Sequence, residues 1–405
     1  MTDKKIRGEY QMRILLILRG APGCGKTTYI KDHRLIPYTL SFDNIRMLFK
    51  SPVQTIYGKE SSDRKKDSFV FDTLLMILEE RMKSGELTVI DHINSKTVEL
   101  NQYQELALKY RYKTYLIDFT SIPIQVSKER NFNRMARKRV PDHIVDKVYT
   151  EFAGQKIPDE MVIIQPEDLE SIWPKPIDLN KYTKIHHIGD IHGCFDVLKE
   201  AVEDNGRFKE DECYIFLGDY TDRGPQNAEV ILFLKELKDK ENVIFCEGNH
   251  ERWVWNWANR VKDYPDEFAK NTKKQLEAAN IAKKDMRKFY RKLNECCYYT
   301  FDGRTILACH GGIAAIPQNL ATISSHQLIH GVGLYSDLKQ ITNTFKDQAE
   351  KKKIEIFGHR NPDKKPMKFN DSAYCLEGGI EAGGCLRWLV LENGNIIEKE
   401  YRNVR

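Results

Sequence analysis

The feature that most constrains this chain is a glycine-rich loop directly after an apolar run near its start. Residues 12–18 are almost wholly apolar, which is typical of a central parallel strand buried on both faces. Residues 20–27, GAPGCGKT, follow the GxxxxGK[ST] pattern. The glycines let backbone N–H groups curl around phosphate oxygens, and the next helix presents its N-terminus to the same anion. The sequence therefore predicts a strand, a phosphate-binding loop and a helix in succession.

The side chains that follow the glycines have separate expected roles. Lys26 would reach the β- and γ-phosphates of a nucleoside triphosphate, and the Thr27 hydroxyl would hold Mg²⁺. The expected cofactors are therefore ATP, or another nucleoside triphosphate, and Mg²⁺. We expect the nucleotide to contact Gly20, Gly23, Cys24, Gly25, Lys26, Thr27 and Thr28.

Two further apolar runs end in acidic residues. Residues 37–42 lead to Asp43, and Arg46 lies one helical turn later. A carboxylate there could take the proton of an acceptor hydroxyl while the arginine grips a phosphate, although an i,i+3 surface ion pair would have the same spacing. Residues 87–90 lead to Asp91, which is either the Mg²⁺-associated carboxylate of a P-loop enzyme or an ordinary strand-end cap.

A basic segment follows the next apolar run, residues 114–119. Arginines on a mobile segment over a triphosphate can stabilise charge on the transferred phosphoryl group. A solvated basic helix is the other interpretation. The residues concerned are Arg130, Arg134, Arg137, Lys138 and Arg139.

These motifs resemble those of polynucleotide 5′-kinases over most of residues 10–155. The resemblance rests on residues 20–27, the Asp43–Arg46 pair, the strand ending in Asp91, and Arg130 and Arg134 ahead of Val140-Pro141. It implies that Asp43 is the general base that activates a nucleic-acid 5′-hydroxyl. It also implies that Arg46 binds the acceptor's 3′-side phosphate. Arg134 would contact the transferred γ-phosphate, with Arg130 as the next candidate.

Five polar motifs follow apolar runs in the second half of the chain. They are GDIHG (189–193), GDYTDRG (218–224), GNHE (248–251), HGG (310–312) and GH (358–359). Carboxylate, imidazole and amide groups suit a pair of hard-to-borderline cations, and a carboxylate with two oxygens is a natural bridge between them. In this order the motifs resemble the binuclear metallophosphoesterase family.

That resemblance implies a role for each polar residue. The implied metal ligands are Asp190 and His192 for the first ion, Asp219 as the bridge, and Asn249, His310 and His359 for the second ion. Mn²⁺ is the metal that the family suggests. Arg223 would clamp two phosphate oxygens through its planar fork. His250 would bind substrate and protonate the leaving alkoxide, and Asp222 would orient that imidazole.

Prolines 158, 166, 174 and 176 indicate a domain boundary. We therefore predict an α/β chain with an N-terminal P-loop parallel sheet flanked by helices (1–160) and a linker (161–180). Residues 181–405 would form an α/β/β/α metallophosphoesterase sandwich.

Residues 252–295 would be a helical insertion of net charge +6, which suits single-stranded nucleic acid. Its tryptophans, at 253, 255 and 257, are better explained as core residues.

The composition sets the expected compartment. Net charge is +5, the nine cysteines include no CxxC pair, and the apolar runs near the start are too short to span a membrane. We expect a cytoplasmic protein with reduced thiols, with no membrane partner and with a homodimer left open.

The order of the two domains resembles the bacterial polynucleotide kinase–phosphatases of RNA repair. This implies ATP-dependent phosphorylation of 5′-OH ends and removal of 3′- or 2′-phosphate or 2′,3′-cyclic phosphate, on RNA in preference to DNA, with a separate ligase. The alternatives are a Ser/Thr protein phosphatase or dinucleoside-polyphosphate hydrolase joined to a small-molecule kinase, and a silent RNA-binding module. Two positions depart from the family pattern: Arg360, where a small polar residue is expected, and residues 377–379, EGG, where relatives have an Asp-containing turn.

Overall fold

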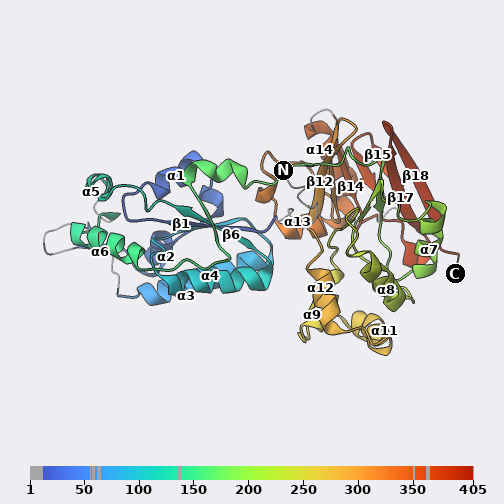
Figure 1. Ribbon diagram of the computed structural model, residues 1–405, viewed down its shortest axis with the longest axis horizontal. Coiled ribbons are helices and arrows are strands. Elements are labelled where there is room, and N and C mark those ends of the chain that lie inside the picture. The colour runs from blue at the N-terminus through green and yellow to red at the C-terminus, as the bar shows by residue number, and fades with distance from the viewer. Residues whose placement is uncertain are drawn as a thin grey trace. The chain divides into compact units, whose positions relative to one another are not determined.

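The computed structural model describes residues 12–404 apart from 55, 57–59, 62–64, 136–137, 350–351 and 362–364. These residues form two compact units (Figure 1). One consists of residues 12–173 and 319–324, and the other of residues 174–318 and 325–404. Among the described residues, no helix combines the length and the apolar character needed to cross a bilayer.

A parallel sheet forms the centre of the N-terminal unit. Its strands lie in the order β2 (Thr39–Ser41), β5 (Thr88–Asp91), β1 (Ile14–Arg19), β6 (Lys113–Asp118) and β7 (Val162–Ile164). Each neighbouring pair runs parallel, and every residue of β1 is buried. The predicted parallel sheet with a buried first strand is therefore confirmed.

Helices cover both faces of this sheet. Leu15 and Ile17 of β1 share a cluster with α2 (Phe42–Phe49), α3 (Asp67–Lys83) and α4 (Thr97–Tyr110). Leu16 and Leu18 point the opposite way and share a cluster with α1 (Lys26–Asp32). Two more helices, α5 (Ile124–Phe132) and α6 (Asp142–Ala153), contact each other, and α6 packs beside Ala21 of the glycine-rich loop.

The boundaries of two predicted segments differ in the structure. α2 begins at Phe42, so Asp43 lies in the first turn of a helix and not directly at the end of a strand. The stretch 161–180 contains β7 and the 3₁₀ helix η3 (Pro166–Ser171), and the two units divide between Trp173 and Pro174. Pro166 begins η3 because proline fits the first turn of a helix, where its missing N–H has no partner to lose.

Two sheets pack face to face in the C-terminal unit. The first has the order β11 (Val243–Phe245), β10 (Glu212–Phe216), β9 (Lys184–Ile188), β17 (Cys385–Glu392) and β18 (Asn395–Arg402). The second has the order β15 (Lys368–Asn370), β16 (Ala373–Cys375), β14 (Lys353–Phe357), β13 (Arg304–Cys309), β12 (Cys296–Phe301) and β8 (Ile177–Asp178). Ile185, Ile215 and Leu389 of the first sheet join Tyr299 and Ile356 of the second in one buried cluster.

Helices complete the sandwich on its outer sides. α7 (Phe195–Asp204) and α8 (Asn227–Leu237) share a buried cluster with the first sheet, and α14 (Leu338–Gln348) contacts β15 and β16 of the second. This layering confirms the predicted α/β fold class.

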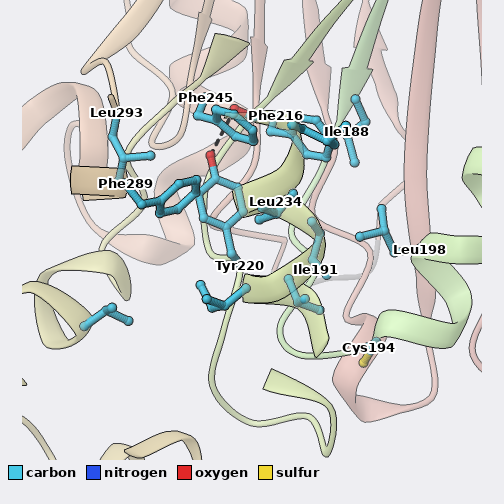
Figure 2. Packing of buried hydrophobic residues seen from close by; sticks show 14 of the residues in the cluster. Ile188, Ile191, Cys194, Leu198, Phe216, Tyr220, Leu234, Phe245, Phe289 and Leu293 are labelled. Carbon is cyan, nitrogen blue, oxygen red and sulfur yellow. Dashed lines mark hydrogen bonds between the residues drawn. The ribbon is translucent and has the colours of Figure 1, made fainter. Parts of the chain in front are cut away.

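The helical insertion packs onto the outer cluster of the first sheet. It comprises α9 (Glu251–Ala258), α10 (Asp266–Lys270), α11 (Thr272–Ala278) and α12 (Lys283–Tyr290). Trp257 is buried, and Trp255 stacks on Tyr290 with ring centroids 4.6 Å apart. Figure 2 shows the ring of Tyr220 beside those of Phe245 and Phe289, so the insertion shares the core of the sheet.

A buried glutamate in β14 gives a prediction about stability. Burial raises the pKa of Glu355 from 4.5 to about 8, and its Oε2 accepts the N–H of Ile313. The folded chain thus holds this proton more tightly than the unfolded chain, so stability falls as the pH rises from about 4.5 to about 8. We expect Glu355→Gln to be more stable than the wild type at pH 9, by on the order of 2–4 kcal/mol, and nearly equal to it at pH 5. Thermal melts at both pH values measure this, and an equal difference at both would contradict it.

Candidate functional site

The five polar motifs of the C-terminal unit lie where strands end. β9, β10 and β11 are parallel neighbours, and Asp190, Asp219 and His250 follow within five residues of their last positions. β13 and β14 are also parallel; His310 follows β13 directly, and His359 lies two residues after the end of β14. Because parallel strands place their carboxyl ends at the same edge, these loops converge.

The backbone at this edge is strained. Five non-glycine residues of the motifs have positive φ: His192 at 43°, Asp219 at 51°, Asp222 at 78°, Arg223 at 66° and His359 at 66°. Such conformations are uncommon for residues other than glycine and concentrate at functional sites. The loops also approach closely, since a Cβ added to Gly358 would lie 2.1 Å from Oδ1 of Asp190.

The structure brings three groups of potential metal ligands together. They are His192 with Asp219 and His250, Asp219 with His310 and His359, and Asp190 with His192 and Glu377, and within each group the ligand atoms lie within 4.8 Å of one another. Asp219 belongs to two groups. Its Oδ2 lies 3.6 Å from Nε2 of His192, and its Oδ1 lies 3.3 Å from Nε2 of His310. One oxygen of Asp219 therefore faces each of these two groups.

Hydrogen bonds at the far side of the rings orient the two central histidines. Nδ1 of His192 donates to the carbonyl of Thr221 at 3.2 Å, and Nδ1 of His310 donates to the carbonyl of Leu217 at 3.1 Å. With Nδ1 protonated, Nε2 of each ring keeps its lone pair and directs it toward Asp219. Second contacts of this kind are usual for metal-ligating histidines.

The electron-pair donors at this edge fit divalent cations. Nε2 of His310 faces Oδ1 of Asn249 at 3.1 Å as well as Oδ1 of Asp219 at 3.3 Å, so three electron-pair donors converge. Burial, and then the carboxylates of Glu377 and Asp219, raise the pKa of Asp190 well above its ordinary value. Cations between these groups would bind the converging electron-pair donors and would offset the repulsion among the carboxylates.

His250 and Arg223 lie beside these ligands. Nδ1 of His250 donates to Oδ2 of Asp222 at 2.9 Å, and the hydroxyl of Thr272 donates to the other oxygen of Asp222. Burial opposes protonation of His250, but Asp219 and Asp222 outweigh it and raise its pKa. The Arg223 guanidinium lies 3.4 Å from Nε2 of His250. The structure thus brings together Arg223 and His250, the residues predicted to clamp phosphate and to act as the acid.

Three glutamates in this region were not predicted as site residues. Glu251 is buried and accepts the N–H groups of Gly248, Asp219 and Tyr220 at 2.7, 2.9 and 2.9 Å. Glu377 joins Asp190, and Glu381 forms an ion pair with Arg223 at 2.7 Å. Glu251 and Glu377 could have been identified from the sequence, because Glu251 ends the GNHE motif and Glu377 lies at one of the two departures from the family pattern. No sequence motif marks Glu381.

The other departure, Arg360, has a structural role. It is 1% exposed and donates to the carbonyls of Gly311, Val332 and Leu334. These hydrogen bonds connect the HGG loop to the residues that follow α13 (Ser325–His330).

In the N-terminal unit, a cavity of about 690 Å³ opens at the glycine-rich loop. Lys26 donates to the carbonyls of Gly20 and Ala21 at 2.5 and 3.2 Å. The expected nucleotide-contacting residues Gly23, Gly25, Thr27 and Thr28 line this cavity, while Gly20 and Cys24 do not. Cys24 is buried, 3.7 Å from Nζ of Lys26. Charged residues from other elements complete the lining: Asp43, Arg46, Asp67, Asp91, Arg130, Arg134 and Lys138.

Arg46 joins two carboxylates of this lining. It donates to Oδ1 of Asp43 at 2.5 Å and to both oxygens of Asp67 at 2.8 and 3.2 Å. Burial opposes ionisation of Asp43, but Arg46 outweighs it and lowers the pKa. Asp91 behaves differently, because burial raises its pKa. The Asp43–Arg46 pair thus faces the same cavity as Lys26 and is not a remote surface ion pair.

Together, a P-loop cavity and a converging set of carboxylates and histidines indicate a protein that acts on phosphate groups. Residues 183–393, more than half of the chain, match the family model described as calcineurin-like phosphoesterase, and the chain belongs to this family. Residues 15–154 match a second family model, described as an AAA domain. The protein is therefore a calcineurin-like phosphoesterase with an N-terminal P-loop domain.

Solved structures similar to this chain include three kinds of phosphatase. A putative diadenosine tetraphosphatase is 16% identical over 56% of this chain and 98% of its own, with a TM-score of 0.39. A protein serine/threonine phosphatase from Saccharomyces cerevisiae is 17% identical over 57% and 85%, with a TM-score of 0.40. A cold-active protein-tyrosine phosphatase from a Shewanella species is 18% identical over 56% and 81%, with a TM-score of 0.38.

The shared position of Asp219 predicts how metal binding responds to mutation. We expect calorimetric titration with Mn²⁺ to give two ions per chain for the wild type. Asp219→Asn should weaken both steps by roughly 10–100-fold or more, whereas Glu377→Gln should weaken one step only. Glu210→Gln, at an exposed position, is the control. Equal weakening of both steps by Glu377→Gln would contradict this arrangement.

Proposed function

We propose that this protein heals the ends of broken nucleic acid strands, RNA in preference to DNA. The N-terminal domain would transfer a phosphate from ATP to a 5′-hydroxyl. The C-terminal domain would remove a 3′- or 2′-phosphate and open a 2′,3′-cyclic phosphate, so that a separate ligase can seal the break. The observation that carries this proposal is the Asp43–Arg46 pair in the same cavity as Lys26.

The kinase cavity offers separate groups for donor and acceptor. The loop after β1 and Lys26 suit the phosphates of ATP, and the hydroxyl of Thr27, which lines the same cavity, would hold Mg²⁺. Asp43, whose side chain is 48% exposed and whose pKa is lowered, can accept the proton of a sugar hydroxyl. Arg46 can hold the neighbouring phosphate of the strand. A kinase whose acceptor carries no phosphate has no need of that second phosphate contact.

Basic residues near the transferred group support the same interpretation. Arg130, Arg134 and Lys138 all line the cavity. Their positive charge can stabilise the phosphoryl group as it moves between donor and acceptor. Arg134 is the proposed contact to the γ-phosphate, with Arg130 as the alternative.

The phosphoesterase site can act on a phosphate at a strand end. When bound, divalent cations supply Lewis acidity and lower the pKa of water. Arg223 can donate to two phosphate oxygens. His250, held by Asp222, can give the proton at Nε2 to the leaving sugar oxygen. Exposed basic residues of the insertion, among them Arg260, Lys274 and Lys284, can attract the rest of the strand.

One oligonucleotide tests both activities. An RNA with a 5′-OH and a 2′,3′-cyclic phosphate is incubated with ATP, Mg²⁺ and Mn²⁺, and both ends are followed by electrophoresis and mass spectrometry. We expect Lys26→Ala to abolish only 5′ phosphorylation and Asp219→Ala to abolish only 3′-end healing, so each variant controls for the other. Lys31→Ala, at the exposed end of α1, should retain both activities.

The activity of the wild-type protein on this RNA distinguishes the proposed function from the alternative functions. If it leaves both RNA ends unchanged, the proposal is wrong, and a phosphoprotein or dinucleoside polyphosphate becomes the substrate to test. A DNA strand with 5′-OH and 3′-phosphate ends, processed faster than the RNA, would overturn the preference for RNA.

Substitutions of Asp43 and Arg46 should change different kinetic constants of the kinase reaction. Removing a general base lowers the rate of the chemical step by roughly 10²–10⁴-fold, so Asp43→Asn should lower kcat for the 5′-OH strand by about that factor. Arg46→Gln should chiefly raise KM for the strand, with KM for ATP little changed, because it removes a binding contact. Glu105→Gln on α4 is an exposed control. A lower kcat with unchanged KM for Arg46→Gln would place Arg46 at the reacting group instead.

A further inference from the structure

The turn between β16 and β17 presents Glu381 to the phosphoesterase site, in addition to Glu377, which lies beside Asp190 and His192. It contains the 3₁₀ helix η6 (Ile380–Ala382), with Gly379 and Gly383 in left-handed conformations on either side. The turn is closed by hydrogen bonds from the N–H of Gly384 to Gly379 and from Cys385 to Gly378, at 2.9 and 3.1 Å. Ile380 is fully buried and anchors the turn in the core. Glu381 is therefore held in a fixed place.

Glu381 is paired with Arg223, the residue placed to clamp phosphate. Oε1 of Glu381 accepts from Nη1 of Arg223 at 2.7 Å. The Glu381 side chain is 16% exposed and that of Arg223 is 42% exposed. Among the described residues, Oε2 of Glu381 is buried and has no hydrogen-bond partner. The carboxylate thus uses one oxygen to hold the clamp and keeps its second oxygen unpaired.

The ion pair also fixes the direction of the guanidinium. Nη1 of Arg223 lies 3.3 Å from Nε2 of His192, and Nη2 lies 3.4 Å from Nε2 of His250. A flexible arginine side chain must lose rotamer freedom to reach this position, and a fixed carboxylate partner lowers that loss on substrate binding.

The same carboxylate keeps a negative charge beside Arg223, the proposed phosphate contact. A phosphomonoester carries close to two negative charges at neutral pH, and a phosphodiester, including a cyclic one, carries one. Repulsion by Glu381 is therefore greater for the monoester.

We propose that Glu381 is the specificity-determining residue of the phosphoesterase site. It positions Arg223 and favours singly charged phosphodiesters over doubly charged phosphomonoesters. The inference deepens the proposed function by naming cyclic phosphodiesters as the preferred class, yet it depends only on phosphoesterase activity and not on RNA as substrate.

Two small esters test this separately from RNA repair: para-nitrophenyl phosphate and bis-para-nitrophenyl phosphate, each with Mn²⁺. Glu381→Gln keeps an acceptor for Arg223 but removes the charge. We expect it to shift the ratio of kcat/KM toward the monoester by about three- to tenfold, the size expected for one screened unit charge. The Ki of inorganic phosphate should fall by a similar factor.

A second variant isolates the positioning role. Glu381→Ala should shift the ester ratio as Glu381→Gln does and should also raise KM for both esters, because Arg223 loses its partner. Glu236→Gln, exposed on α8, is the matched control and should change neither quantity. An unchanged ester ratio in Glu381→Gln overturns the proposal, as does an equal loss of both activities accompanied by a lower melting temperature. Because Glu381→Gln is isosteric, the test stands even if Glu381→Ala fails to fold.

Discussion

A buried carboxylate that reaches no substrate holds the phosphoesterase site together. Glu251 accepts three backbone N–H groups, from Gly248, Asp219 and Tyr220, and so ties the loop after β11 to the loop after β10. Burial, and then the charge of Asp219, raise the pKa of Glu251 to about 7. The cost of this burial is offset by hydrogen bonds to groups that would otherwise be unpaired. The left-handed backbone of Asp219 is thereby held in place, and with it the bridge between the two groups of ligands.

The sequence predicted those parts of the fold and site that depend on local pattern. Residues 12–18 indicated a buried parallel strand because both of its faces are apolar, and the polar motifs stood at strand ends because such loops carry the chemistry of α/β folds. Asp43 was placed at a strand end, yet it lies inside α2, because a helix start after a three-residue strand has no distinct signal. Glu381 and Asp67 were missed for another reason: each meets its arginine through tertiary structure, across 158 and 21 positions of sequence.

The sites of the two domains differ in the charge of the residues that line them. The P-loop cavity is lined by Lys26, Arg130, Arg134 and Lys138, together with Asp43, Asp67 and Asp91, so basic groups that can bind an anion belong to the protein itself. The phosphoesterase site is lined by Asp190, Asp219 and Glu377, which repel an anion until cations are present. Anion binding in the phosphoesterase site therefore depends on bound cations more strictly than anion binding in the P-loop cavity does.

The positive φ angles of the phosphoesterase loops bear on how this protein can be engineered. Each of the five non-glycine residues in that conformation costs on the order of 1 kcal/mol relative to glycine. Selection for heat resistance would therefore reward glycine where the side chain makes few stabilising contacts, as at the partly exposed Arg223, and not at Asp222, whose buried carboxylate is hydrogen-bonded to His250 and Thr272. Libraries screened on folding alone should drift toward inactive proteins through these few positions. The site persists because catalysis, and not stability, is what preserves it.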